Sequence, residues 1–176
     1  IDKEKWMLVV NAANITKDRT HFERHLAKPA KFRDASEETA KLDLQGPLSR
    51  DVLLKLVPDI KKLEYYTFDF FELLGERVII SRTGYTGELG YEIYYPWGKA
   101  KKVWDSLLAD PRVKPTGLGV RDVLRIEMCY PLYGHELTDN ISPLEAGLKT
   151  FVTMTKDFLG KDSLLAMQKN GLPKKV

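Results

Sequence analysis

One carboxylate stands inside a run of glycines, where another molecule could approach it closely. Gly84, Gly87 and Gly90 fall within seven residues, and Glu88 directly follows the second of them. Glycine allows positive φ and leaves room beside the backbone. The pattern is typical of a turn that holds a ligand at Glu88. It is equally typical of a plain hairpin corner whose acid faces water.

The segments on either side of the glycines predict two strands. Residues 78–80 are an apolar run that is typical of a buried strand. After the glycines, Tyr91, Ile93 and Tyr95 alternate with more polar neighbours, so they are expected on one face of a second strand. The whole stretch from 78 to 95 therefore predicts strand, glycine turn and strand.

The remaining patterns predict an α+β fold, in which helices cover an antiparallel or mixed sheet built from ferredoxin-like β-α-β units. The expected strands are 5–10, 39–44, 65–71, 77–82, 91–95 and 149–155, and the expected helices are 15–26, 48–56, 99–109, 120–128 and 161–169. The aromatic residues of 65–71 are expected in the core. Ser142 and Glu145 predict a capping box at a helix start.

Composition limits the classes of protein to which the chain can belong. The chain has 176 residues, 43% hydrophobic and 30% charged, as is ordinary for a globular domain. No apolar run approaches the ~20 residues that cross a membrane. A net charge of +3 gives no reason to expect nucleic acid as a partner. Cys129 is the single cysteine, which excludes an internal disulfide and a zinc site built on several cysteines.

Several familiar catalytic patterns are missing. His21 and His25 are four apart on an expected helix, but Glu23 stands one place too late for the zinc-protease motif, and no third ligand supports a metal site. Gly117 and Gly119 lack the third glycine of a dinucleotide fingerprint. There is no P-loop and no nucleophile elbow. No role is assigned to His135 or Cys129.

Seven short stretches together resemble the aminomethyltransferase of the glycine cleavage system, the T-protein. They occur in the order of that family and cover nearly the whole chain, at residues 9–14, 44–47, 81–88, 117–122, 131–137, 143–148 and 157–161. Each stretch alone is weak, whereas seven in order are specific.

The resemblance implies a folate-dependent one-carbon transfer. In this family the aminomethyl group hangs from the dihydrolipoyl arm of the H-protein, and tetrahydrofolate takes the carbon with release of ammonia. The implied cofactor is tetrahydrofolate, and the implied partner is the lipoylated H-protein, with no metal, nucleic acid or membrane. The implied location is the bacterial cytoplasm, or the mitochondrial matrix if the source is eukaryotic.

The resemblance also implies which residues hold the folate. Glu88 matches a pterin-binding glutamate, whose carboxylate accepts the amino group and ring N–H of the pterin edge together. Arg121 matches a folate-contacting arginine. Asn11 and Val9 match the strand that lines the same pocket, although a turn is the simpler interpretation of Asn11 from the sequence alone.

Parts of the family pattern lie outside the chain. The catalytic aspartate of the family is expected upstream of residues 5–10, and the family's C-terminal β-barrel domain has no counterpart here. Residues 1–176 are therefore expected to be an incomplete, central folate-binding region, inactive by itself, with no catalytic residue of its own.

Other functions remain open. One is the folate-binding domain of a sarcosine- or dimethylglycine-type oxidase. Another is a non-enzymatic folate-binding factor for iron–sulfur assembly, which carries a Lys-Gly-Cys-Tyr motif where this chain has Met128, Cys129 and Tyr130. A third is a truncated domain that keeps no pocket.

Overall fold

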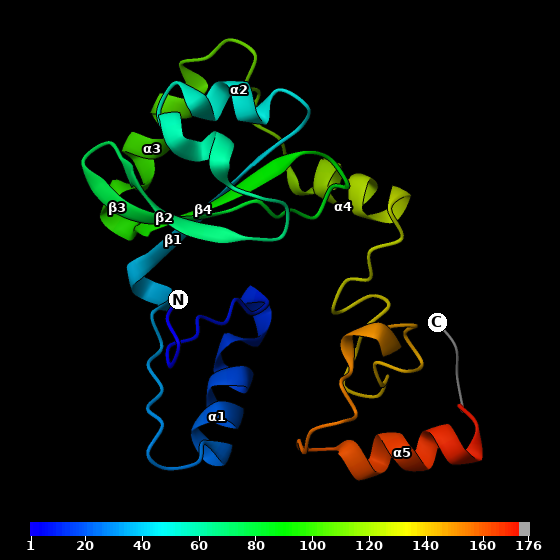
Figure 1. The fold of residues 1–176 in the computed structure, drawn as a ribbon. Helices are drawn as coiled ribbons and strands as arrows, with labels where there is room; N and C mark the ends of the chain where they lie inside the picture. Colours follow the sequence, from blue (N-terminus) through cyan, green and yellow to red (C-terminus); the bar gives the residue numbers. More distant parts are fainter. Residues whose placement is uncertain (173–176) are drawn as a thin grey trace. The chain divides into compact units, whose positions relative to one another are not determined.

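The computed structural model describes residues 1–172, in two compact units that meet between Leu124 and Arg125. The first unit is centred on a four-stranded sheet in the order β1-β4-β3-β2, in which every pair of neighbours is antiparallel (Figure 1). The strands are β1 (Thr39–Gln45), β2 (Phe68–Leu73), β3 (Glu76–Ser81) and β4 (Gly90–Pro96). The predicted α+β class is confirmed.

Helices cover one face of this sheet. They are α2 (Ser49–Leu54), α3 (Ala100–Leu108) and the 3-10 helix η3 (Pro58–Lys62). Val52, Leu53 and Ile60 from α2 and η3, with Val103 and Leu107 from α3, belong to one buried cluster with the sheet. The apolar sides of the helices and the sheet are therefore buried against each other.

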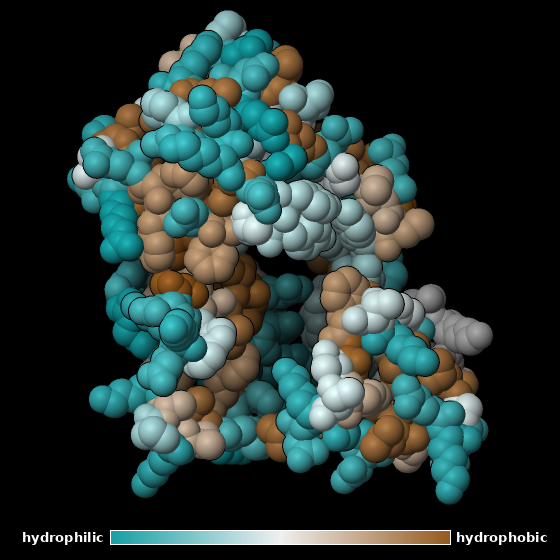
Figure 2. Space-filling model, viewed as in Figure 1, coloured by the Kyte–Doolittle hydropathy of each residue, from teal (hydrophilic) through white to brown (hydrophobic). Residues whose placement is uncertain are grey.

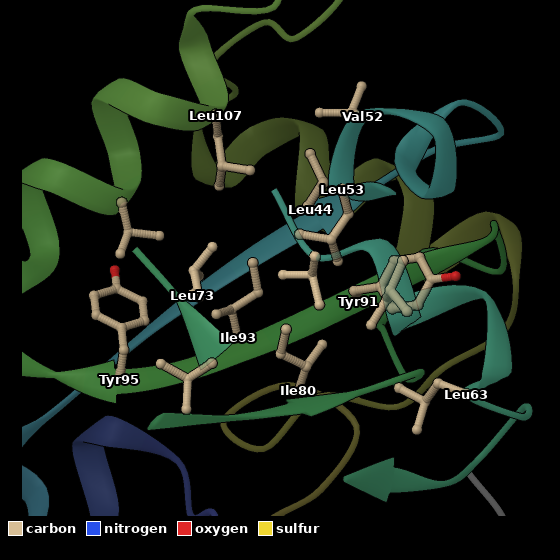
Figure 3. Close-up of a cluster of buried hydrophobic side chains, with 14 of the residues drawn as sticks. Leu44, Val52, Leu53, Leu63, Leu73, Ile80, Tyr91, Ile93, Tyr95 and Leu107 are labelled. Carbon is tan, nitrogen blue, oxygen red and sulfur yellow. The ribbon is translucent and has the colours of Figure 1, made fainter. Parts of the chain in front are cut away.

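The core draws on alternate residues of the strands, as a period of two requires. Tyr91, Ile93 and Ile80 are fully buried, and Tyr95 is nearly so. Figure 3 shows these side chains directed toward the residues of α2 and α3. The prediction that Tyr91, Ile93 and Tyr95 share a buried face is confirmed.

The outer surface of the helical layer is mainly hydrophilic. In Figure 2 the residues over the outside of α2 are mostly teal, broken by small brown patches. This is the pattern of helices that turn one apolar side inward.

The remaining elements lie outside the sheet. The first unit also holds η1 (Ala12–Asn14), α1 (Ile15–His25), η2 (Ser36–Glu38) and η4 (Trp97–Lys99). Helix α4 (Leu118–Glu127) crosses the boundary into the second unit, which holds η5 (Lys149–Phe151) and α5 (Lys161–Asn170).

Two predicted strands are wrong. Residues 6–10 belong to no helix or strand and pair with no strand within 1–172, and Trp6 is 75% exposed. Apolar character alone does not make a strand, since the backbone groups need a partner. Residues 149–151 form η5 instead of a strand, and Phe151 is exposed.

The aromatic stretch before β2 is only partly in the core. Tyr65 and Tyr66 are exposed, and Tyr66 has a positive φ of 59° that turns the chain before β2 begins at Phe68. Phe71 packs against the core cluster, whereas Phe68 lies on the other face and is half exposed. Alternation within β2 separates these rings.

Candidate functional site

The glycine turn is a broad loop over residues 82–89. It joins β3 to β4, which pair only from Ile79 opposite Tyr94 to Ser81 opposite Glu92. Gly87 has a φ of +73°, the left-handed conformation that favours glycine. The loop is attached to the start of α2, because the backbone N–H of Gly46 and the hydroxyl of Ser49 both donate to the carbonyl of Leu89, at 2.8 and 3.0 Å.

A row of polar side chains crosses the face of the sheet opposite the core. Asp43 on β1 lies opposite Glu92 on β4, and Glu92 lies opposite Ser81 on β3. Lys41 and Tyr94, directly opposite one another, are two residues along on the same face. These five residues are called the polar face below.

Charges on the polar face are paired. The ammonium of Lys41 lies 2.9 Å from an oxygen of Asp43 and donates to Glu92. Glu92 also accepts from the hydroxyl of Thr83, and from that of Tyr94 at 3.4 Å. The side chain of Glu92 is 17% exposed, so this carboxylate is held mainly by protein groups.

The surroundings shift the protonation of three of these groups. Burial opposes ionisation of Glu92, but hydrogen bonds from Lys41 and Thr83 outweigh it and lower the pKa of the carboxyl. Burial likewise opposes the charge on Lys41, and the carboxylates of Asp43 and Glu92 overcome it and raise its pKa. Burial, reinforced by the charge of Glu92, raises the pKa of Tyr94.

Arg121 extends the polar face from α4. Its guanidinium donates to Asp43 at 3.0 Å and lies 4.8 Å from the centre of the Tyr85 ring. The cation therefore has a carboxylate beside it and an aromatic ring below it, which fixes its position. Its side chain remains 42% exposed. The structure thus brings the predicted Arg121 to the glycine loop through Tyr85.

The other predicted site residues are exposed and do not belong to the polar face. Glu88 is exposed, and its side chain makes no hydrogen bond or ion pair with any residue of the described chain, although its backbone N–H donates to the Thr86 hydroxyl at 3.3 Å. Asn11 is exposed at the N-terminus of η1, where its carbonyl accepts from the N–H of Asn14. Val9 is 58% exposed. Neither Asn11 nor Val9 lies in a strand, contrary to the expectation for 5–10.

The sequence does not predict four residues of this site. Asp43 and Tyr85 contact Arg121, and Lys41 and Glu92 lie with Asp43 on the polar face. Alternation does carry a signal for Lys41, Asp43 and Glu92, because the charged members of residues 40–44 and 91–95 fall on the opposite face of each strand from the apolar ones. Tyr85 lies in the loop, outside both ranges. The register that sets Asp43 against Glu92 cannot be obtained from alternation alone.

The second unit contains a buried arginine that organises a loop. Arg125 is 3% exposed and donates to the carboxylate of Glu136 at 2.7 Å and to the carbonyl of Tyr130 at 3.2 Å. The same carboxylate accepts from the backbone N–H of Leu132, a bond that, with the Arg125 cation, lowers the pKa of Glu136. The Arg125–Glu136 ion pair and its bonds to the backbone thereby hold residues 130–136 in a loop.

The predicted capping box is confirmed as a hydrogen-bond pattern. The N–H of Ser142 donates to the Glu145 carboxylate at 2.9 Å, and the N–H of Glu145 donates to the Ser142 hydroxyl at 3.3 Å. Residues 143–147 form turns rather than the expected helix. Elsewhere in the second unit, Cys129 is exposed with a positive φ of 55°, and the N–H of His135 donates to the carbonyl of Leu132.

Other kinds of site find little support among residues 1–172. No group of three or more His, Cys, Asp or Glu side chains there is arranged to hold a metal ion, and the His21 and His25 rings lie 4.5 Å apart. No helix in the described part is both long and apolar enough to span a membrane. A hollow lined by Phe70, Arg77 and their neighbours lies at the β2–β3 turn, away from Arg121 and Glu88.

Known proteins resemble this chain along almost its full length. Residues 1–156 match the family described as the GCVT N-terminal domain. An aminomethyltransferase of Pseudothermotoga lettingae is 45% identical over 97% of this chain and 48% of its own length, and one of Thermotoga neapolitana is 43% identical over 96% and 48%.

A solved structure shares the fold. The glycine cleavage system aminomethyltransferase T from Bartonella henselae superposes with a TM-score of 0.75 at 31% identity, over 92% of this chain and 45% of that protein. The chain thus spans about half the length of the relatives it matches. With its antiparallel sheet, covering helices and sequence likeness, this chain belongs to the GCVT family, that of the aminomethyltransferases.

Proposed function

We propose that this chain is the folate-binding region of an aminomethyltransferase of the glycine cleavage system. The parent protein takes the one-carbon unit from the aminomethyl-dihydrolipoyl arm of H-protein, passes it to tetrahydrofolate and releases ammonia. Membership of the family supports this reaction, and the relatives named above are all aminomethyltransferases. Those names favour it over a folate-binding oxidase domain or an iron–sulfur assembly factor.

The observation that carries the proposal is the fixed position of Arg121. Its guanidinium is held by Asp43 at 3.0 Å and by the Tyr85 ring, and it is still partly exposed. A planar donor that is fixed before the ligand arrives loses little entropy on binding. It suits an acceptor such as a carbonyl or carboxylate oxygen, and tetrahydrofolate carries both.

A second group is needed for the donor edge of the pterin, which presents an amino group beside a ring N–H. We propose Glu88 as the paired acceptor, because it is exposed on the glycine loop and available to a ligand. Glu92 is the competing acid. It lies in the same row as the Asp43 that holds Arg121, but its oxygens already accept from Lys41 and Thr83.

Val9 and Asn11 complete the proposed set. Both are exposed in a segment that has no strand partner among residues 1–172, so both are available to line a pocket that includes further parts of the protein. In this reaction the chain's own groups bind and orient folate, which places its nucleophilic nitrogen against the carbon to be transferred. We propose that the 176-residue chain alone supports little or no turnover, because it matches only about half of each relative.

The location follows from the pathway in which such an enzyme works. We propose the cytoplasm for a bacterial source and the mitochondrial matrix for a eukaryotic one. Fractionation of the source cells, with detection of the chain by antibody, tests this directly.

Calorimetric titration with tetrahydrofolate, on the chain with its natural flanking sequence, tests the binding role of Arg121. Arg121→Lys keeps the charge but loses the planar fork, and should weaken binding roughly tenfold. Arg24→Lys is the matched control, since Arg24 is exposed on α1. Equal affinities for the two variants would remove Arg121 from the site.

The same titration separates the two acids. Glu88→Ala should weaken binding by about 2 kcal/mol or more, roughly thirtyfold, because the pterin donors would be buried without an acceptor. If Glu92→Gln causes that loss and Glu88→Ala does not, the acceptor is Glu92. If the full-length parent protein, supplied with loaded H-protein and tetrahydrofolate, forms no methylenetetrahydrofolate, the proposed reaction is wrong.

A further inference from the structure

We infer that Gln45 is a positioning residue, which holds the 82–89 loop in the shape that keeps Tyr85 on Arg121 and Thr83 on Glu92. The effect of Gln45 on folate binding rests on the function proposed above, whereas its effect on the structure of the loop does not. Gln45 is the last residue of β1 and lies directly opposite Gly90.

Both ends of the Gln45 amide are used. The amide N–H₂ donates to the carbonyl of Thr83 at 3.2 Å and reaches the carbonyl of Tyr91 at 3.5 Å. The amide oxygen accepts from the hydroxyl of Thr86 at 3.1 Å. One side chain from β1 therefore joins the start and the middle of the loop to the beginning of β4.

Two glycines make the space for this side chain. A Cβ added to Gly84 would lie 2.0 Å from the amide oxygen of Gln45, and a Cβ added to Gly90 would lie 1.9 Å from it. Neither glycine has a positive φ, so their small size, and not backbone freedom, is what the structure uses here. Gly84 and Gly90 thus leave the space that the side chain of Gln45 occupies.

The loop residues that Gln45 holds are themselves in contact with, or next to a residue in contact with, the candidate site residues. Thr83, held through its carbonyl, donates its hydroxyl to Glu92. Thr86, held through its hydroxyl, accepts the N–H of Glu88 at 3.3 Å. Between them lies Tyr85, whose ring supports Arg121. Gln45 therefore sets the positions of both candidate acids and of the arginine, whichever acid meets the ligand.

Hydrogen exchange of the backbone amides of residues 84–89, by NMR, tests the loop without any ligand. Gln45→Met keeps the length of the side chain but removes its hydrogen bonds, and should speed exchange in the loop roughly tenfold or more. Gly84→Ala should do the same by displacing the amide. The controls are Gln168→Met on the exposed side of α5 and Gly98→Ala, where an added Cβ meets nothing within 4 Å.

A double mutant tests whether Gly84→Ala loosens the loop by displacing Gln45. If Gly84→Ala acts by displacing Gln45, it should add nothing to a Gln45→Ala background. The Tyr85 ring lies 4.8 Å from the Arg121 guanidinium and is expected to shift its Nε–H resonance, which should move toward its free value in Gln45→Met. A general loss of stability would not restrict the change to these signals.

Loop exchange within twofold of wild type in Gln45→Met, or additive effects in the double mutant, would overturn the inference. Tetrahydrofolate titration of the same proteins is read separately. Wild type that binds no folate refutes the proposed function and leaves the loop result standing. Wild type that binds folate and a Gln45→Met variant that binds it equally well, despite a loosened loop, refutes the positioning role.

Discussion

Neutralising Glu92 is expected to destabilise the first unit in a way that depends on pH. Glu92→Gln keeps the size of the side chain and an oxygen that accepts from Thr83, but removes the charge that pairs with Lys41. The Lys41 ammonium is not stranded, because Asp43 remains 2.9 Å away. We therefore expect a cost of about 1–2 kcal/mol at neutral pH, below the ~3–5 kcal/mol of a buried ion pair that loses one partner.

The sign of the pH dependence follows from the direction of the shift. Glu92 has an ordinary pKa of 4.5, and its partners lower that value in the folded protein. The unfolded chain therefore takes up a proton first as the pH falls. The stabilisation from the ionised carboxylate is present above about pH 4.5 and is lost as the pH falls through the lower pKa of the folded state.

Urea unfolding of wild type and Glu92→Gln, from pH 7 down to pH 3, measures this contribution. The difference in free energy of unfolding should be largest at pH 7 and should shrink as the solution becomes acidic. Glu72→Gln, an exposed position on β2, is the matched control and should show little difference at any pH. A wild-type advantage that is zero at pH 7, or that stays constant to pH 3, would refute this account of Glu92.

Three further changes test other parts of the chain. Ile93→Ala should lower the free energy of unfolding by about 2–5 kcal/mol in urea melts, since Ile93 is fully buried in the core, and a cost below 1 kcal/mol would contradict that packing. Asp110→Asn should lower the melting temperature at pH 7, because Arg112 and Lys55 both donate to Asp110 and lower its pKa, and an unchanged melting temperature would mean that these contacts contribute nothing. Arg125→Met should speed amide exchange at residues 130–136 without moving that of the sheet, and unchanged exchange there would show that the ion pair does not close the loop.

The sequence predicted those parts of the fold in which local pattern and tertiary packing agree. Residues 39–44 and 91–95 alternate strictly, and both became strands with their apolar members in the core. The prediction was wrong where an apolar segment has no neighbouring strand to pair with. Residues 6–10 are more apolar than β1, but within the described chain no strand pairs with them.

The site was less predictable, because its groups meet across the sheet. Glu88 stands out in the sequence as an acid among glycines, yet two of those glycines, Gly84 and Gly90, accommodate Gln45, for which the residue pattern predicts no such role. Arg121 was identified through the family resemblance alone. Its supports, Asp43 and Tyr85, come from two other elements and become visible only once the register is known.

The two faces of strand β4 have different surroundings, because one packs in the core and the other carries part of the polar face. Tyr91, Ile93 and Tyr95 face the core, so Glu92 and Tyr94 must face the other way. A register slip of one residue would bury a carboxylate and expose two fully buried side chains, which costs far more than any single contact of the polar face. Burial of the core therefore fixes where Glu92 lies relative to Asp43. Core substitutions that keep the volume should leave the polar face in place, whereas substitutions that let β4 shift should disturb both together.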